Sequence, residues 1–202
     1  MYKGRKAIYF ILSSMAIAAV SSFLWTPWYT MVYMPKPLGY PRIVLPAHTY
    51  TPLSGHFPYT FAVSSHAVVK PAVATHADKY WINIYYPTFD ATIHLPYKPV
   101  QDNPRLLREY CDDAYQLTAK HQVRASSIEE KAFKTPEGNM VVMALLSGQV
   151  PSQVQFYVTD TKQHFLRGAL YFTTATQNEY LAPIIAFIQE DILHLLHTLA
   201  WK

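Results

Sequence analysis

One stretch of the chain decides the fold: VQFYVTDTKQHFLRGALYF, from Val154 to Phe172. Aromatic and β-branched residues fill two arms, Val154–Thr159 and Phe165–Phe172, and the polar break Asp160-Thr161-Lys162-Gln163 separates them. Residues of this kind suit a half-buried pleated surface, and a short polar break between two such runs is typical of a turn. The stretch therefore predicts a β-hairpin.

Three residues of this hairpin stand at positions where we expect a plain hairpin to need nothing special: His164, Arg167 and Gly168. A guanidinium presents several donors in one plane, so Arg167 is suited to hold a carboxylate or a backbone carbonyl. Within the hairpin itself, we expect Arg167 to pair with Asp160 in a structural contact.

Outside the hairpin, alternating and apolar runs predict further strands at 57–63, 68–69, 80–86, 91–95 and 140–147. The run 80–86, YWINIYY, carries bulky residues on both faces, so we expect it to be a central strand paired with 91–95. Residues 127–133 fit either a helix or the edge of a sheet.

Two amphipathic helices complete the pattern. The first should run from Pro104 to about Arg124, because Asn103 is a good N-cap and Pro104 suits the first helical position. The second should run from about Glu179 to Thr198. Charged residues interrupt this second helix, so we expect a docked helix and not a membrane span. Its docking face should consist of Ile184, Ile188, Ile192 and Leu195.

Short strands joined by tight turns, with two amphipathic helices, indicate an α+β fold whose mainly antiparallel sheet is covered by the helices. The order of elements, with a late hairpin before a long terminal helix, resembles PsbP and Mog1-type domains. A likeness of this kind concerns the fold and implies no function.

Charge and composition exclude some classes of function. The chain has 202 residues and a formal net charge of +4. Three of its 17 Lys and Arg are Lys3, Arg5 and Lys6, and without them 14 basic residues stand against 13 acidic ones. The part beyond them is close to neutral, so we expect no nucleic-acid partner.

The N-terminus predicts export. Lys3, Arg5 and Lys6 precede an uncharged run from Ala7 to Trp25, which is the pattern of a signal peptide or a retained membrane anchor. Small residues within the run would permit cleavage, whereas aromatic residues just beyond it favour retention. We expect three regions: 1–25 as signal or anchor, 26–56 as a proline-rich extended segment, and 57–202 as the folded domain.

The chain offers little chemistry. His194 and His197 are three residues apart on the last predicted helix, but no third ligand accompanies them, so we expect no metal. Asp90 with His94 repeats the spacing of Asp160 with His164, which we interpret as chance. The single cysteine, Cys111, occupies an apolar helical position and should be buried and inert. We expect no catalytic residue, no cofactor and no enzymatic activity.

A set of short motifs from Met34 to Leu199 resembles the gliding motility lipoprotein GldD family of Bacteroidota. The segments that carry the resemblance are Pro35–Tyr40 with Arg42, Pro58–Phe61, Trp81–Pro87, Ile93–Leu95 with Tyr97-Lys98, Leu117–His121, the hairpin, and Leu181–Pro183 with Asp191-Ile192. The family's lipidated cysteine, which should directly follow the apolar N-terminal run, is absent here, which puts lipid anchoring in doubt but not export.

The resemblance implies a non-enzymatic component of the gliding motility and type IX protein secretion machinery, facing the periplasm and anchored to a membrane. Its partners would be other envelope proteins of that machinery. The alternative is a periplasmic module that binds a small molecule or a glycan through its aromatic residues. We expect one functional surface to include Tyr40, Arg42, Tyr59, Trp81, His164 and Arg167. The alternative is that Tyr59 and Trp81 belong to the core, which for Trp81 is the favoured interpretation.

Overall fold

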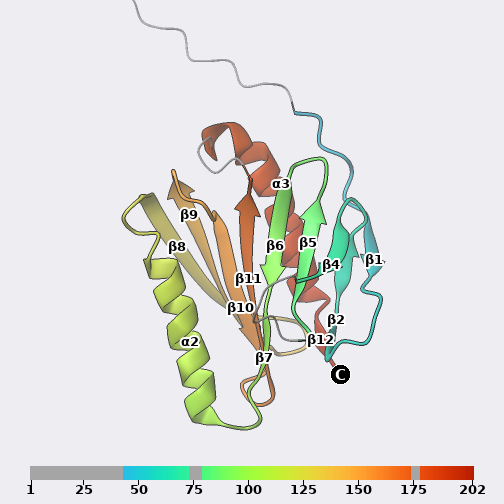
Figure 1. The fold of residues 1–202 in the computed structure, drawn as a ribbon, viewed down its shortest axis with the longest axis vertical. Coiled ribbons are helices and arrows are strands. Elements are labelled where there is room, and N and C mark those ends of the chain that lie inside the picture. Colours follow the sequence, from blue (N-terminus) through green and yellow to red (C-terminus); the bar gives the residue numbers. More distant parts are fainter. Residues whose placement is uncertain (1–42, 73–78, 174–177) are drawn as a thin grey trace, which may run out of the picture. The chain divides into compact units, whose positions relative to one another are not determined.

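The computed structural model describes residues 43–72, 79–173 and 178–202. The anchor expected at 1–25, together with Tyr40 and Arg42, lies outside the described residues. Figure 1 shows the elements in chain order. They are β1 (Tyr50–Pro52), β2 (Tyr59–Thr60), β3 (Ala62–Ser64), β4 (Val68–Pro71), β5 (Ile82–Tyr86), β6 (Ala91–Leu95), β7 (Tyr97–Pro99), α2 (Pro104–Ala119), β8 (Ala125–Lys134), β9 (Met140–Gly148), β10 (Val154–Thr159), β11 (His164–Phe172), α3 (Asn178–His197) and β12 (Ala200–Trp201).

An antiparallel sheet of eight strands forms the centre of the fold. Seven of its strands follow the order β4-β5-β6-β11-β10-β9-β8, and β7 pairs with the first part of β11. Two small pairs, β1 with β3 and β2 with β12, lie outside this sheet. The expected α+β class with a mainly antiparallel sheet is confirmed.

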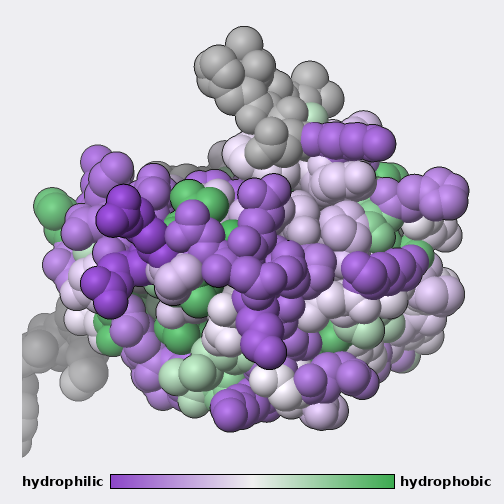
Figure 2. Space-filling model, turned by 90° about the horizontal axis from the view of Figure 1, so that it is seen from below, coloured by the Kyte–Doolittle hydropathy of each residue, from purple (hydrophilic) through white to green (hydrophobic). Residues whose placement is uncertain are grey.

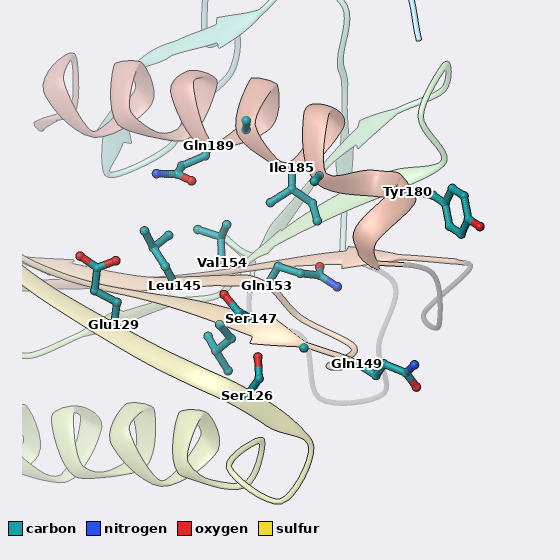
Figure 3. A pocket seen from close by; sticks show the side chains of 14 residues that line it. Ser126, Glu129, Leu145, Ser147, Gln149, Gln153, Val154, Tyr180, Ile185 and Gln189 are labelled. Atoms are coloured by element: carbon teal, nitrogen blue, oxygen red, sulfur yellow. The ribbon is translucent and has the colours of Figure 1, made fainter. Parts of the chain in front are cut away.

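The two helices lie on opposite faces of the sheet, because side chains alternate along β10 and β11. Phe156 and Leu166 point into the large core with α3, whereas Tyr157 and Phe165 pack with α2. Figure 3 shows the same layering, with α3 on one side of the strands and α2 on the other. The sheet is therefore the middle layer of three.

The hairpin and the terminal helix are confirmed. Val158 stands opposite Leu166 in the register of β10 and β11, and both side chains are fully buried. All four residues expected on the docking face of α3 are buried in the large core. Neither of the described helices is long and apolar enough to cross a membrane.

Other elements differ from the sequence predictions. Helix α2 ends at Ala119 and not near Arg124, because Lys120 caps it and residues 120–124 form turns that lead into β8. Residues 127–133 belong to β8, a full strand at the sheet edge. The expected strand 57–63 is divided between β2 and β3, which pair with different partners.

A buried carboxylate fastens the segment around β1 to α3. Asp191, which is 3% exposed, accepts hydrogen bonds from Tyr50 Oη at 3.0 Å and from Tyr86 Oη at 3.0 Å. His48 Nδ1 lies 2.7 Å from Asp191 Oδ1, and its Nε2 lies 2.9 Å from Glu190 Oε2. Desolvation and the Asp191 carboxylate raise the pKa of Tyr50 to about 12, so this phenol stays a donor at neutral pH. The end of the proline-rich segment is thus held by the domain.

Replacing Ile188 by Asp should lower the free energy of unfolding by more than about 3 kcal/mol, because it removes a fully buried aliphatic side chain and places a charge in the core. Chemical denaturation measures the loss. Ala186→Asp, at an exposed position on the same helix, is the matched control and should cost much less. Equal stability of the two variants would contradict the docking described here.

Replacing Asp191 by Ala should cost about 2 kcal/mol or more, because Tyr50, Tyr86 and His48 all lose their buried acceptor. The neighbouring Glu190→Ala is the control. Its side chain is 68% exposed, so it should cost less than about 1 kcal/mol. Equal melting temperatures of the two variants would show that the cluster does not hold the segment.

Candidate functional site

The sequence-predicted site residues that the structure describes fall into two places. Tyr59, Trp81 and His164 all contact Tyr97, whereas Arg167 lies on the opposite face of β11 from the large core. The structure thus separates a group that was expected to act as one surface.

The group around Tyr97 uses its polar atoms internally. The Tyr59 hydroxyl, fully buried, donates to the Tyr80 carbonyl at 2.7 Å, and Trp81 Nε1 donates to the Tyr97 carbonyl at 2.7 Å. The Tyr97 hydroxyl lies 2.8 Å from His164 Nδ1. These contacts account for the packing of the group, and its part in a functional surface stays a prediction.

Arg167 lines a pocket of about 410 Å³ between α2 and strands β8 to β11. Side chains from one helix and four strands form it. They are Cys111, Ala114, Tyr115, Thr118, Glu130, Lys131, Ala132, Val142, Ala144, Gln155, Phe156, Tyr157 and Arg167. The lining combines small apolar residues with a few polar groups, as small-ligand sites do. We take this α2 pocket as the candidate functional site.

The donors of the α2 pocket converge on one amide. Arg167 Nη2 donates to Gln155 Oε1 at 2.7 Å, and Thr118 Oγ1 lies 3.2 Å from the same oxygen and 3.1 Å from the Ala114 carbonyl, so its single proton is shared between these two acceptors. The expected pairing of Arg167 with Asp160 is wrong. The Asp160 carboxylate instead accepts from the backbone N–H groups of the turn, including that of His164 at 2.9 Å, because these donors lie directly beside it.

Strand register places these groups. Gln155 stands opposite Ala169, so Arg167, two residues earlier on β11, is its diagonal neighbour on the same face. Gly168 fixes the register of β10 against β11, and with it the position of Gln155 and Arg167, since a Cβ at Gly168 would clash with the ring of Phe156. Only glycine permits the Phe156 ring to cross the backbone of β11 at this point.

The electrostatics of the α2 pocket favour binding over catalysis. Burial lowers the pKa of Arg167, which still remains charged at neutral pH. Burial likewise raises the pKa of the Cys111 thiol and brings the pKa of Tyr157 to about 12, so both are neutral. The interior of the pocket therefore holds one cation, Arg167, with neutral donors and no activated nucleophile, while the charged side chains of Glu130 and Lys131 lie at its exposed edge. Within the described residues, no group of three His, Cys, Asp or Glu side chains is placed to hold a metal ion.

A second hollow, of about 710 Å³, lies on the other face of the sheet between α3 and strands β8 to β10. Figure 3 shows Ile185 and Gln189 reaching from α3 toward Leu145 and Val154 on the strands. It is larger than the α2 pocket, but no Lys or Arg side chain lines it. Neither hollow is lined by Tyr59, Tyr85 or Trp81, the aromatic residues that would enclose a small molecule in the alternative hypothesis.

The outer surface shows no extended apolar area on the face drawn in Figure 2, where hydrophobic residues lie among hydrophilic ones. Exposed large apolar side chains include Tyr115 and Leu117 on α2 and Val123 just after it. Of these three, Tyr115 lies at the α2 pocket itself.

Sequence reasoning missed Gln155, Thr118 and the Asp191 cluster. A signal was present for two of them. Gln155 interrupts an apolar strand whose neighbours Val154 and Phe156 are buried, and Asp191 lies seven residues after Ile184 on the apolar stripe of α3. A polar residue at a core position is an indication of a specific partner.

The chain belongs to the family described as gliding motility lipoprotein GldD, whose sequence model matches residues 30–201. It is therefore a member of a class of envelope lipoproteins that is connected with gliding motility. Among solved structures, the chain is similar to cyanobacterial PsbP (CyanoP) from Synechocystis sp. PCC 6803, with a TM-score of 0.48, 8% identity, and coverage of 82% of this chain and 99% of that one. A comparison with curated proteins finds no match.

The geometry around His164 predicts a pH dependence. Burial lowers the pKa of His164 from its ordinary value of 6.5, with Asp160 acting in the opposite direction. The folded state thus binds this proton less tightly than the unfolded state, so stability should fall as the pH drops below about 6.5. An NMR titration of the imidazole should place its pKa below that value.

His164→Phe is the comparison for this prediction, because it keeps a ring against Trp201 and removes the titrating group. Its stability should depend less on pH between 7 and 5. Part of the dependence will remain, since burial also lowers the pKa of His94 and His121. An unchanged pH dependence would exclude His164 as a contributor.

Proposed function

We propose that this protein is a non-enzymatic component of the gliding motility and type IX protein secretion machinery, and that it acts through contacts with other envelope proteins. The observation that carries this proposal is the family match over residues 30–201. The folded domain faces the periplasm in this proposal, and the apolar run at 7–25 holds it at the membrane.

The residues of the α2 pocket support a binding role. The α2 pocket presents neutral donors and a cation without an activated nucleophile, which suits recognition. The Tyr59 hydroxyl and the Trp81 indole N–H are used inside the fold, so they are poorly placed to bind a glycan. A role as a partner-binding module therefore has more support than glycan binding through Tyr59 and Trp81.

In this proposal Cys111 lines the α2 pocket and does not serve as a lipid anchor. It lies half-buried on α2, within the folded domain, and so is not a cysteine that follows an exported N-terminal segment. Anchoring in the proposal rests on the N-terminal apolar run.

Deletion of the gene should abolish gliding of single cells and reduce the amount of type IX-secreted protein in the culture medium. Restoring the wild-type gene should recover both, and the Arg167→Ala variant should recover them only in part although it accumulates to the wild-type level. Arg108→Ala, which changes an exposed arginine on α2, is the matched control and should recover both fully. Normal gliding and secretion in the deletion strain would overturn the proposed function.

A further inference from the structure

The α2 pocket contains a buried donor without an acceptor. Gln155 is 2% exposed, and its Nε2 has no hydrogen-bond partner among the described residues. The orientation of this amide is fixed, because Arg167 is only a donor and therefore must face the oxygen. The nitrogen is then the atom without an acceptor, and because it has almost no exposed surface of its own, a ligand reaches it only if the pocket wall shifts slightly.

An unmet buried donor is costly. Leaving such a group without a partner costs about 1–3 kcal/mol, and folded proteins contain few of them. The same pocket holds Arg167, whose guanidinium is largely withdrawn from solvent and forms no ion pair with any carboxylate of the described residues. Gln155 Nε2 and the Arg167 guanidinium, neighbours in one pocket, thus both lack an anionic acceptor.

The remaining walls restrict the occupant. The interior is lined by small or apolar residues such as Ala114, Val142 and Ala144, while Glu130 and Lys131 are exposed strand residues that also line the pocket. One interior cation suits a single negative charge, whereas the like charge of Glu130 would repel a phosphate dianion more strongly. A carboxylate has two oxygens in one plane, which matches a guanidinium and an amide N–H₂ side by side.

We propose that the α2 pocket binds a carboxylate carried on a small apolar group, with Arg167 and Gln155 Nε2 donating to its oxygens and Thr118 holding the amide in place. The inference rests on the proposed function only in assigning this carboxylate to a partner protein, as a chain terminus or as an acidic side chain. The pocket volume of about 410 Å³ accommodates one residue of such a partner.

The test uses the full chain, purified in detergent and labelled with ¹⁵N. N-acetylleucine represents a terminal carboxylate, N-acetylaspartic acid α-amide represents an acidic side chain, and N-acetylleucinamide is the neutral control. One of the two acids should shift the Gln155 side-chain and Arg167 Nε resonances to saturation, with at least tenfold tighter binding than the neutral amide. The acid that binds more tightly identifies the source of the carboxylate.

Two variants and one control separate this binding from general surface attraction. Arg167→Lys keeps the charge but loses the planar donor pair, so it should weaken binding several-fold. Gln155→Met should weaken binding of the acid while leaving the weak binding of the neutral amide unchanged. Arg108→Ala should bind as the wild type does.

The single cysteine supplies a second readout, since Cys111 lines the same pocket. Alkylation of Cys111 by iodoacetamide should slow several-fold when the acid is bound and should not respond to the neutral amide. If neither acid binds more tightly than the amide, or if Arg167→Lys and Gln155→Met bind as the wild type does, the inference is wrong. This result would leave the proposed function standing, because no step here depends on gliding or secretion.

Discussion

The pairing of β10 with β11 is the constraint on which the rest of this structure depends. Strand β11 joins the two halves of the sheet, since it pairs with β10 on one side and with β6 and β7 on the other. A shift of one residue would turn every side chain of both strands to the opposite face. Phe156 packed across Gly168 prevents this shift, because no other position of β11 has a glycine to receive the ring.

The same register produces two different faces. Val158 and Leu166 point into an apolar core with α3, whereas the opposite face receives α2 and carries Gln155 and Arg167. Polar groups of this kind would be costly within the large core. They are tolerated on the α2 side because a small helix interface leaves a pocket there. Packing on one face thus sets the position of the donors on the other.

The sequence predicts the elements whose pattern is local. Alternation within the hairpin and the apolar stripe around Ile188 were sufficient to assign both, since each signal lies within one element. The sequence could not predict the contacts between residues that are far apart along the chain. His48 and Asp191 are 143 positions apart in the sequence, and Gln155 and Thr118 are 37 positions apart. For the same reason Arg167 was expected to bind Asp160, its near neighbour, when its actual partner is on the adjacent strand.

The α2 pocket and the cluster that holds the end of the proline-rich segment lie on opposite sides of the sheet. The chain enters the domain along α3, where His48 stacks on Phe187 at 4.2 Å and contacts the buried Asp191. Arg167 lies on the side of α2, across the full thickness of the sheet. A ligand at Arg167 therefore does not compete with the cluster that holds the segment. Because the packed sheet separates the two sites, a mutation at one of them touches no residue of the other.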